Sequence, residues 1–244
     1  MDKKIKALVT KYSGNETLLI QLVVKAFVKY NHLELGNGFL SDFAGVTNQE
    51  LEADIELLSV QCTIEDIISI FKLAIPNVEK TANGAVYTPK YIRDYIVRQV
   101  MHSVEKPLEE CLCADISCGC GAFLYTLAVY IHEHTGELYC NIFNKLYGVD
   151  ISTTSVNRAK IMLALVALLN GKIIQEDLFN LFVGDSLTFD FQSMPNVTTN
   201  NGLDVIVGNP PYVRSKHINK ETKKNLSFWS SSKVGNADLY IPFF

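Results

Sequence analysis

The chain reads Cys111-Leu-Cys-Ala-Asp115-Ile-Ser-Cys-Gly119-Cys-Gly121-Ala-Phe123 between residues 111 and 123. A short apolar run passes through two closely spaced glycines into the start of a helical pattern. Glycines at such a turn let the backbone approach a ligand closely, and the helix that follows presents free N–H groups at its amino end. The stretch therefore predicts a strand, a ligand-binding loop and a helix in succession.

The same alternation continues along the chain. Apolar runs that predict strands lie at 111–116, 145–149, 179–183 and 203–207, and helical patterns lie at 122–134 and 155–169. Strands that alternate with helices are typical of a parallel sheet wound with helices. We therefore predict an α/β fold for this part of the chain.

The first eighty residues read differently. Apolar residues recur at three- and four-residue spacing over 16–30, 49–60 and 63–74, which predicts helices. We expect Thr63 to cap the last of these helices together with Asp66, and Thr88 to cap a further helix over 90–102 with Pro89 in its first turn. The prediction is a small helical domain over 1–80 and a second domain over 81–244.

Three acids follow three of the predicted strands, at Asp115, Asp150 and Asp185. Ligands of wound sheets bind at the carboxyl ends of the strands, where Asp150 could accept hydrogen bonds from both ribose hydroxyls of a nucleoside cofactor. A nicotinamide-dependent dehydrogenase fits less well. Leu124 stands where its third glycine would be, and Asp150 lies 35 residues after Asp115 rather than the ~20 expected.

The fourth predicted strand runs directly into a loop that reads Asp204-Val-Ile-Val-Gly-Asn209-Pro210-Pro211-Tyr212. Prolines and asparagine are ordinary loop residues, so the loop alone could be structural. Its position at the same end of the sheet as the three acids favours a role in the site.

Charge and cysteine content restrict the class of protein. The formal net charge is −4, but residues 214–233 carry six basic residues and one acid, which is compatible with contacts to DNA phosphates or with a solvated loop. The spacing of the six cysteines favours reduced, partly buried thiols over a zinc site. No run is long enough to cross a membrane, and we expect a cytoplasmic protein. The cysteines are Cys62, Cys111, Cys113, Cys118, Cys120 and Cys140.

These segments, taken in order, resemble N6-adenine-specific DNA methyltransferases of restriction-modification systems. Tyr87-Thr88-Pro89 looks like the cofactor motif before the Gly-rich loop, Asn209-Pro-Pro-Tyr212 looks like the catalytic loop, and Asp238-Leu-Tyr-Ile-Pro-Phe243 looks like the motif after it. The resemblance covers about residues 83–244. It implies a Rossmann-like class I sheet that is incomplete at its C-terminus, with the target-recognition region absent.

The resemblance also implies the chemistry and its residues. S-adenosylmethionine would be the cofactor and double-stranded DNA the partner, with a restriction or specificity region possible in the full-length protein. The catalytic residues would be Asn209, Pro210, Pro211 and Tyr212, which would accept the adenine N6 hydrogens and stack on a flipped base. The implied cofactor-binding residues are Tyr87, Thr88, Asp115, Ser117, Cys118, Gly119, Gly121, Asp150, Ile151, Asp185, Ser186, Asn209 and Phe243.

Alternatives stay open at this point. A protein glutamine N5-methyltransferase also resembles this chain in its amino-terminal helical domain and its Asn-Pro-Pro-Tyr loop. Methylation of cytosine N4 and a non-catalytic, S-adenosylmethionine-binding subunit are two further possibilities. Tyr87-Thr88-Pro89 and the basic stretch after Tyr212 favour DNA as the substrate.

Overall fold

One parallel four-stranded sheet organises the protein. The computed structural model describes residues 3–75, 88–218, 220–226, 228–232 and 237–243. The strands are β1 (Cys113–Asp115), β2 (Leu146–Asp150), β3 (Asn180–Val183) and β4 (Val205–Ile206). Their order across the sheet is β3-β2-β1-β4, and every neighbouring pair is parallel. The four predicted strands and the α/β class are confirmed.

Both faces of the sheet are covered, which explains why the strands read as continuous apolar runs rather than alternating ones. Helices α7 (Ala122–Thr135) and α9 (Thr153–Leu169) pack on one face. On the other face, Met194 and Val197 pack against Ala114, Tyr147 and Val149. The connection over 194–202 therefore contributes two buried side chains to the core.

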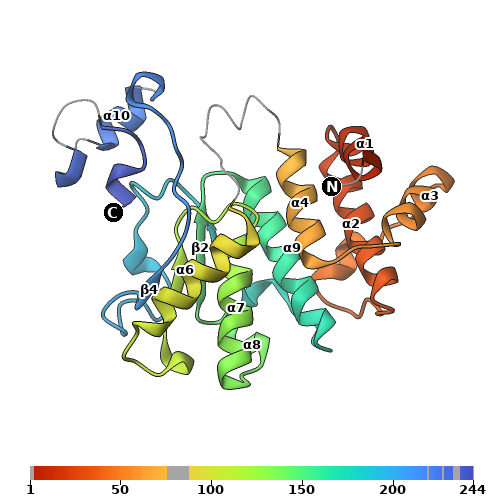
Figure 1. The fold of residues 1–244 in the computed structure, drawn as a ribbon, viewed down its shortest axis with the longest axis horizontal. Coiled ribbons are helices and arrows are strands. Elements are labelled where there is room, and N and C mark those ends of the chain that lie inside the picture. Colours follow the sequence, from red (N-terminus) through yellow and green to blue (C-terminus); the bar gives the residue numbers. More distant parts are fainter. Residues whose placement is uncertain (1–2, 76–87, 219, 227, 233–236, 244) are drawn as a thin grey trace.

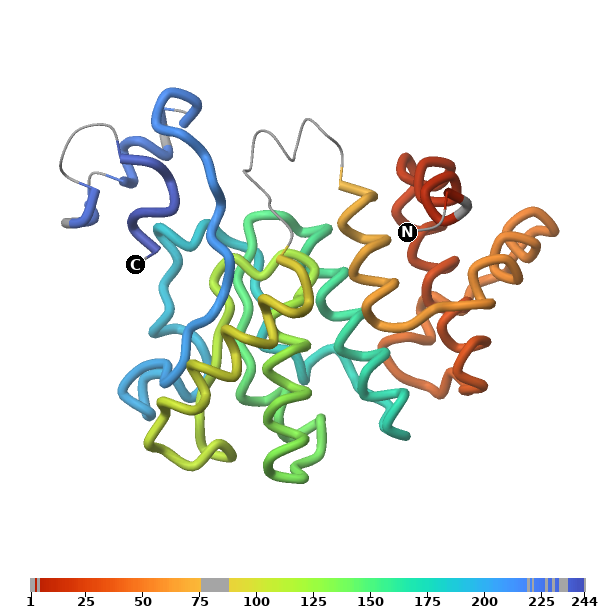
Figure 2. Tube along the Cα trace, in the orientation of Figure 1, coloured from red at the N-terminus to blue at the C-terminus, as the bar shows by residue number. Residues whose placement is uncertain are grey.

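The helices lie around this sheet as Figure 1 shows, with α1 to α4 gathered on one side and α10 with the C-terminal end on the other, and the Cα trace of Figure 2 follows the chain between these two sides. No helix in the described ranges is long and apolar enough to cross a membrane. The remaining α-helices are α1 (Lys3–Tyr12), α2 (Glu16–Tyr30), α3 (Gln49–Leu58), α4 (Ile64–Ala74), α6 (Lys90–His102), α8 (Tyr139–Phe143) and α10 (Lys220–Leu226). Short 3₁₀ helices lie at Phe39–Phe43, Leu108–Glu110, Glu176–Leu178, Phe191–Ser193, Ser215–His217, Ser230–Ser232 and Ile241–Phe243.

Helix α4 begins as its sequence predicts. The Thr63 side chain accepts a hydrogen bond from the Asp66 N–H, and the Asp66 carboxylate accepts one from the Thr63 N–H. This reciprocal capping satisfies two N–H groups that the first turn would otherwise leave unpaired. The predicted capping box is confirmed.

The predicted cap of helix α6 is wrong. Pro89 occupies the N-cap position in an extended conformation and gives no side-chain cap, so Thr88 lies one residue too early to cap the helix. The Thr88 carbonyl oxygen instead accepts a hydrogen bond from Nη1 of Arg93 at 2.9 Å. Thr88 is thus held by the helix it precedes, through its backbone.

Two buried arginines join the amino-terminal helices to the rest of the protein. Arg158 of α9 forms a two-pronged ion pair with Glu16 of α2, at 2.7 and 2.6 Å. Arg93 of α6 donates to Glu65 of α4 at 2.6 Å. Both arginines are less than 5% exposed. The predicted boundary near residue 80 lies outside the described residues, and the two-domain division stays a prediction.

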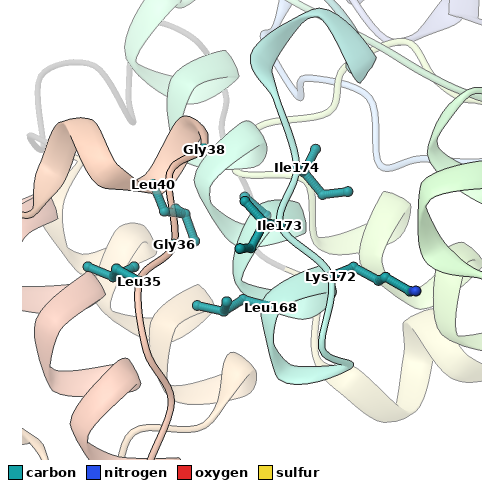
Figure 3. Close-up of a pocket in the computed structure, with 9 residues that line it drawn as sticks. Leu35, Gly36, Gly38, Leu40, Leu168, Lys172, Ile173 and Ile174 are labelled. Atoms are coloured by element: carbon teal, nitrogen blue, oxygen red, sulfur yellow. The ribbon is translucent and has the colours of Figure 1, made fainter.

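A small cavity also lies where these two parts meet. Figure 3 shows the segment from Leu35 to Leu40 facing the end of α9 and the residues that follow it, with Ile173 between them. A Cβ atom at Gly38 would lie 2.4 Å from the Ile173 side chain and 2.9 Å from the Ile174 carbonyl oxygen, so glycine permits the close approach at this position. The cavity, of about 10 Å³, has room for one water molecule.

Candidate active site

The parallel strand order brings four chain segments to one edge of the sheet. Asp115 and Asp150 are the last residues of β1 and β2, Asp185 lies just beyond β3, and Asn209 lies just beyond β4. Because all four strands run in the same direction, these residues share the carboxyl edge, where wound sheets bind their ligands.

The Gly-rich loop is fastened to the end of β2. The Cys118 N–H donates to the Val149 carbonyl oxygen at 3.0 Å, and the Gly119 N–H donates to Oδ2 of Asp150 at 2.8 Å. The other Asp150 oxygen accepts from the Ser152 N–H at 2.9 Å. Asp150 therefore fixes the loop on one side and the first turn of α9 on the other.

The two glycines of this loop have different structural roles. Gly119 has a φ of +52°, and a Cβ atom there would meet nothing within 4 Å, so the loop borders open space at this point. Gly121 has a φ of +82°, and its Cβ would lie 2.9 Å from Cβ of Ala159. Gly121 lets α7 and α9 pack closely, whereas Gly119 leaves the backbone accessible to a ligand.

Asp115 lies beneath the loop that follows β4. Its side chain is 2% exposed, and Oδ1 accepts a hydrogen bond from the Ser117 N–H at 3.0 Å. A Cβ atom at Gly208 would lie 2.5 Å from the same oxygen, so only glycine allows this approach. Burial, reinforced by the nearby Asp150 charge, raises the pKa of Asp115 to about 7 against the opposing effect of the Ser117 hydrogen bonds.

We expect Asp115→Asn to reduce the pH dependence of stability. The pKa of Asp115 is about 7 in the fold, against ~3.9 in an unfolded chain. The folded state therefore binds the Asp115 proton more tightly than the unfolded state does. The contribution of protonated Asp115 to the free energy of unfolding is lost as the pH rises from the unfolded pKa through the folded pKa. Between about pH 5 and about pH 8, the wild type should lose roughly 2 to 3 kcal/mol of unfolding free energy relative to the variant.

Urea denaturation at the two pH values measures this difference. The control is Asp190→Asn, because Asp190 is an exposed acid that caps a short 3₁₀ turn, whereas Asp115 is buried. A wild type and an Asp115→Asn variant that respond equally to pH would show that Asp115 keeps an ordinary pKa.

The loop after β4 is tied to the Gly-rich loop and to the C-terminal segment. The Ser117 hydroxyl donates to the Asn209 carbonyl oxygen at 3.4 Å. The Leu239 N–H donates to the Val213 carbonyl oxygen at 2.9 Å, and the ring centroids of Tyr212 and Tyr240 lie 5.6 Å apart. Tyr212 remains 52% exposed, so its ring is accessible from solvent while its loop is held from both sides.

Asp185 lies in a third loop that is connected to the same region. Its Oδ1 accepts from the Leu187 N–H at 3.0 Å, and its Oδ2 accepts from the Asn225 side-chain amide at 3.4 Å. The neighbouring Ser186 hydroxyl donates to the Ile116 carbonyl oxygen. The loop after β3 is thereby joined to β1 and to α10.

Of the remaining expected cofactor-binding residues, Ile151 and Phe243 lie near the acids at the strand ends, whereas Thr88 makes no described contact there. Ile151 follows Asp150 directly and is 65% exposed, so it presents an apolar surface beside that acid. Phe243 packs against the cluster that contains Leu187, which places it on the Asp185 side. No described contact joins Thr88 to the strand ends, and Tyr87 lies outside the described residues.

Sequence reasoning gave no individual role to two residues of its motifs that shape this site. Gly208 permits the contact with Asp115, and its position just before Asn209 was the available signal. Asp238 accepts a hydrogen bond from the Ser215 N–H at 2.8 Å and so anchors the C-terminal segment to the loop after β4. This contact spans 23 residues, so no local pattern could reveal it.

The cysteines of the Gly-rich loop behave as small apolar residues. Burial raises the pKa of Cys120 to about 11 and that of Cys118 well above its usual range, so both thiols stay protonated at neutral pH. Among the described residues, no three metal-ligating side chains converge. The cavity of Figure 3 lies at the amino-terminal helices, apart from the strand ends.

Comparison with known proteins confirms the resemblance to methyltransferases of restriction-modification systems. Residues 144–244 match the family model of the Eco57I restriction-modification methylase. The chain is similar to the Type II methyltransferase M.BstVI of Geobacillus stearothermophilus (28% identity over 170 residues) and to M.BanIII of Aneurinibacillus aneurinilyticus (25% over 191 residues). These matches cover 66% and 75% of this chain, which spans 30% of the length of each relative.

Solved structures support the fold. The chain resembles the Type IIL restriction-modification enzyme MmeI in complex with DNA, with a TM-score of 0.60 and 14% identity over 92% of this chain and 39% of that one. It also resembles the type IIG restriction endonuclease BpuSI, with a TM-score of 0.63 and 13% identity over 98% of this chain and 31% of the BpuSI chain. At such identities the likeness concerns the fold alone.

Proposed function

From this similarity to restriction-modification methyltransferases, we propose that the chain carries the cofactor-binding and catalytic part of a DNA methyltransferase that modifies N6 of adenine. The observation that carries the proposal is the link between its two loops. The Ser117 hydroxyl of the Gly-rich loop donates to the Asn209 carbonyl oxygen, which holds the Asn-Pro-Pro-Tyr loop against the loop that would bind the methyl donor.

The residues at the strand ends fit S-adenosylmethionine. Gly119 borders open space with a positive φ, so its backbone is accessible to the methionine part of a cofactor. Each Asp150 oxygen accepts one N–H, and a carboxylate oxygen has a second lone pair with which it can accept a ribose hydroxyl. Asp185 would accept the adenine amino group of the cofactor. When bound, S-adenosylmethionine supplies a methyl group already activated on a sulfonium.

The chain's own residues would prepare the target amine. Adenine N6 is a weak nucleophile because its lone pair is delocalised into the ring. The Asn209 side-chain oxygen and the Pro210 carbonyl oxygen would each accept one N6 hydrogen, which favours a pyramidal amine and stabilises the positive charge that develops on it. Pro210 and Pro211 limit the freedom of the loop, so little reorganisation is required.

Double-stranded DNA is the proposed substrate. Five basic side chains that follow the loop are exposed, at Arg214, Lys216, Lys220, Lys223 and Lys224. Such a group can neutralise backbone phosphates. Tyr212 is half exposed beside Asn209 and could stack on a base that has rotated out of the duplex. The proposal includes a cytoplasmic location and a base-reading or restriction region in the full-length protein.

Methyl transfer from labelled S-adenosylmethionine tests the proposal. The 244-residue chain is incubated with unmethylated plasmid DNA, and the digested nucleosides are separated by mass spectrometry. The expected product is N6-methyladenine. N4-methylcytosine would leave DNA as the substrate but replace the base. Label that enters an added release-factor-type protein and not DNA would show a protein glutamine methyltransferase instead.

A further inference from the structure

Trp229 makes a direct hydrogen bond to the loop that holds Asp185. Its indole Nε1–H donates to the Leu187 carbonyl oxygen at 3.1 Å, across 42 residues of sequence. In the structure the polar atom of the ring is used within the protein.

Leu187 connects the indole of Trp229 to the carboxylate of Asp185. Its carbonyl oxygen accepts the indole hydrogen bond, and its N–H donates to Oδ1 of Asp185. The Asn225 amide reaches Oδ2 of the same carboxylate at 3.4 Å. Asn225 and Trp229 therefore contact the two ends of the turn from Asp185 to Leu187.

A small apolar cluster stabilises this arrangement. Leu187 is 8% exposed and packs with Leu226 of α10, and Phe243 lies against the same cluster. The other members come from the segment after Tyr212 and from the C-terminal segment: Val213, Ile218 and Leu239. The Asp185 turn is thus part of one packed unit with the basic segment, rather than a separate loop.

We propose that Trp229 is a positioning residue for the cofactor site: its indole N–H fixes the Leu187 backbone and so aims the Asp185 carboxylate at the adenine amino group of the cofactor. The inference rests on the proposed function, because it gives Asp185 the role stated there. Trp229 itself touches neither substrate nor cofactor in this account. Its effect passes entirely through Asp185, which makes it separable from a general effect on folding.

Calorimetric titration of the 244-residue chain with S-adenosylmethionine tests this inference. Trp229→Phe keeps an aromatic ring but removes the indole N–H. Losing one hydrogen bond that orients a binding group should weaken cofactor affinity by about threefold to tenfold. The matched control is Phe228→Leu, because Phe228 is the adjacent aromatic residue, is 73% exposed, and should leave affinity unchanged.

The same substitution in an Asp185→Ala background separates positioning from a structural role. If Trp229 acts through Asp185, Trp229→Phe should cause no further loss once the carboxylate is gone. An equal loss in both backgrounds, or no loss in the wild-type background, would overturn the inference while cofactor binding by the wild type upheld the proposed function. A wild-type chain that binds no cofactor would overturn both.

Discussion

Asn209→Ala is expected to reduce methyl transfer to DNA by about 10²- to 10³-fold, because removing one preorganised group that stabilises transition-state charge typically costs that much. The Asn209 side chain would act on the adenine amine, and the contact with the cofactor that the resemblance implies for this residue would come from its backbone, which the substitution keeps. Cofactor affinity in calorimetry should therefore stay within about twofold of the wild type. The same reasoning predicts that Asn209→Gln is nearly as inactive, since one added carbon displaces the oxygen by about 1 Å or more.

The matched control for this experiment is Asn141→Ala. Asn141 is an exposed asparagine on α8, a helix that leads into β2 and so lies towards the opposite edge of the sheet. Its substitution should leave the transfer rate unchanged. Equal loss of transfer and of cofactor affinity in Asn209→Ala would show that this loop belongs to the cofactor site, and that the acceptor of the amine hydrogens has been misassigned.

The second large effect concerns stability. Glu16→Gln is expected to lower the free energy of unfolding by about 2 to 3 kcal/mol, because it leaves the Arg158 guanidinium buried without a countercharge. The Arg158 side chain is 5% exposed and the Glu16 side chain 35% exposed, which places the expected loss below that of a fully buried pair. Urea denaturation measures the loss, and the melting temperature should fall by roughly 4 to 10 °C.

An exposed ion pair in the same helical region provides the control. Lys11 and Glu50 have side chains that are 38% and 69% exposed, so Glu50→Gln should cost less than about 1 kcal/mol. Equal, small effects of the two substitutions would contradict the account, because they would mean that water reaches Arg158 and that the ion pair does not join α2 to α9.

The sequence predicted the elements whose signals are local. The Thr63 and Asp66 capping box depends on residues three positions apart, and the strand before Asp150 depends on one continuous apolar run. Local signals have limited accuracy, as Thr88 shows. A threonine before a proline favours a helix start, but Pro89 itself took the cap position, which moved the expected cap one residue outside the helix.

The features that the sequence could not reveal depend on distant partners. Arg93 and Arg158 look like ordinary polar positions on helices, and the carboxylates that balance their buried charge, Glu65 and Glu16, lie 28 and 142 residues away. The contacts of Trp229 with Leu187 and of Asp238 with Ser215 are of the same kind. The candidate site was therefore predicted at the strand ends but not in the contacts that hold its loops together.

The central claim, that the strand ends bind S-adenosylmethionine, is tested most directly by calorimetric titration of the 244-residue chain beside its Asp150→Ala variant. Asp150 both holds the Gly119 N–H and is placed to accept the ribose hydroxyls. The account predicts saturable binding that Asp150→Ala weakens by at least about tenfold, whereas Asp190→Ala leaves it unchanged. Binding that survives Asp150→Ala intact, or no binding by the wild-type chain, would contradict the claim.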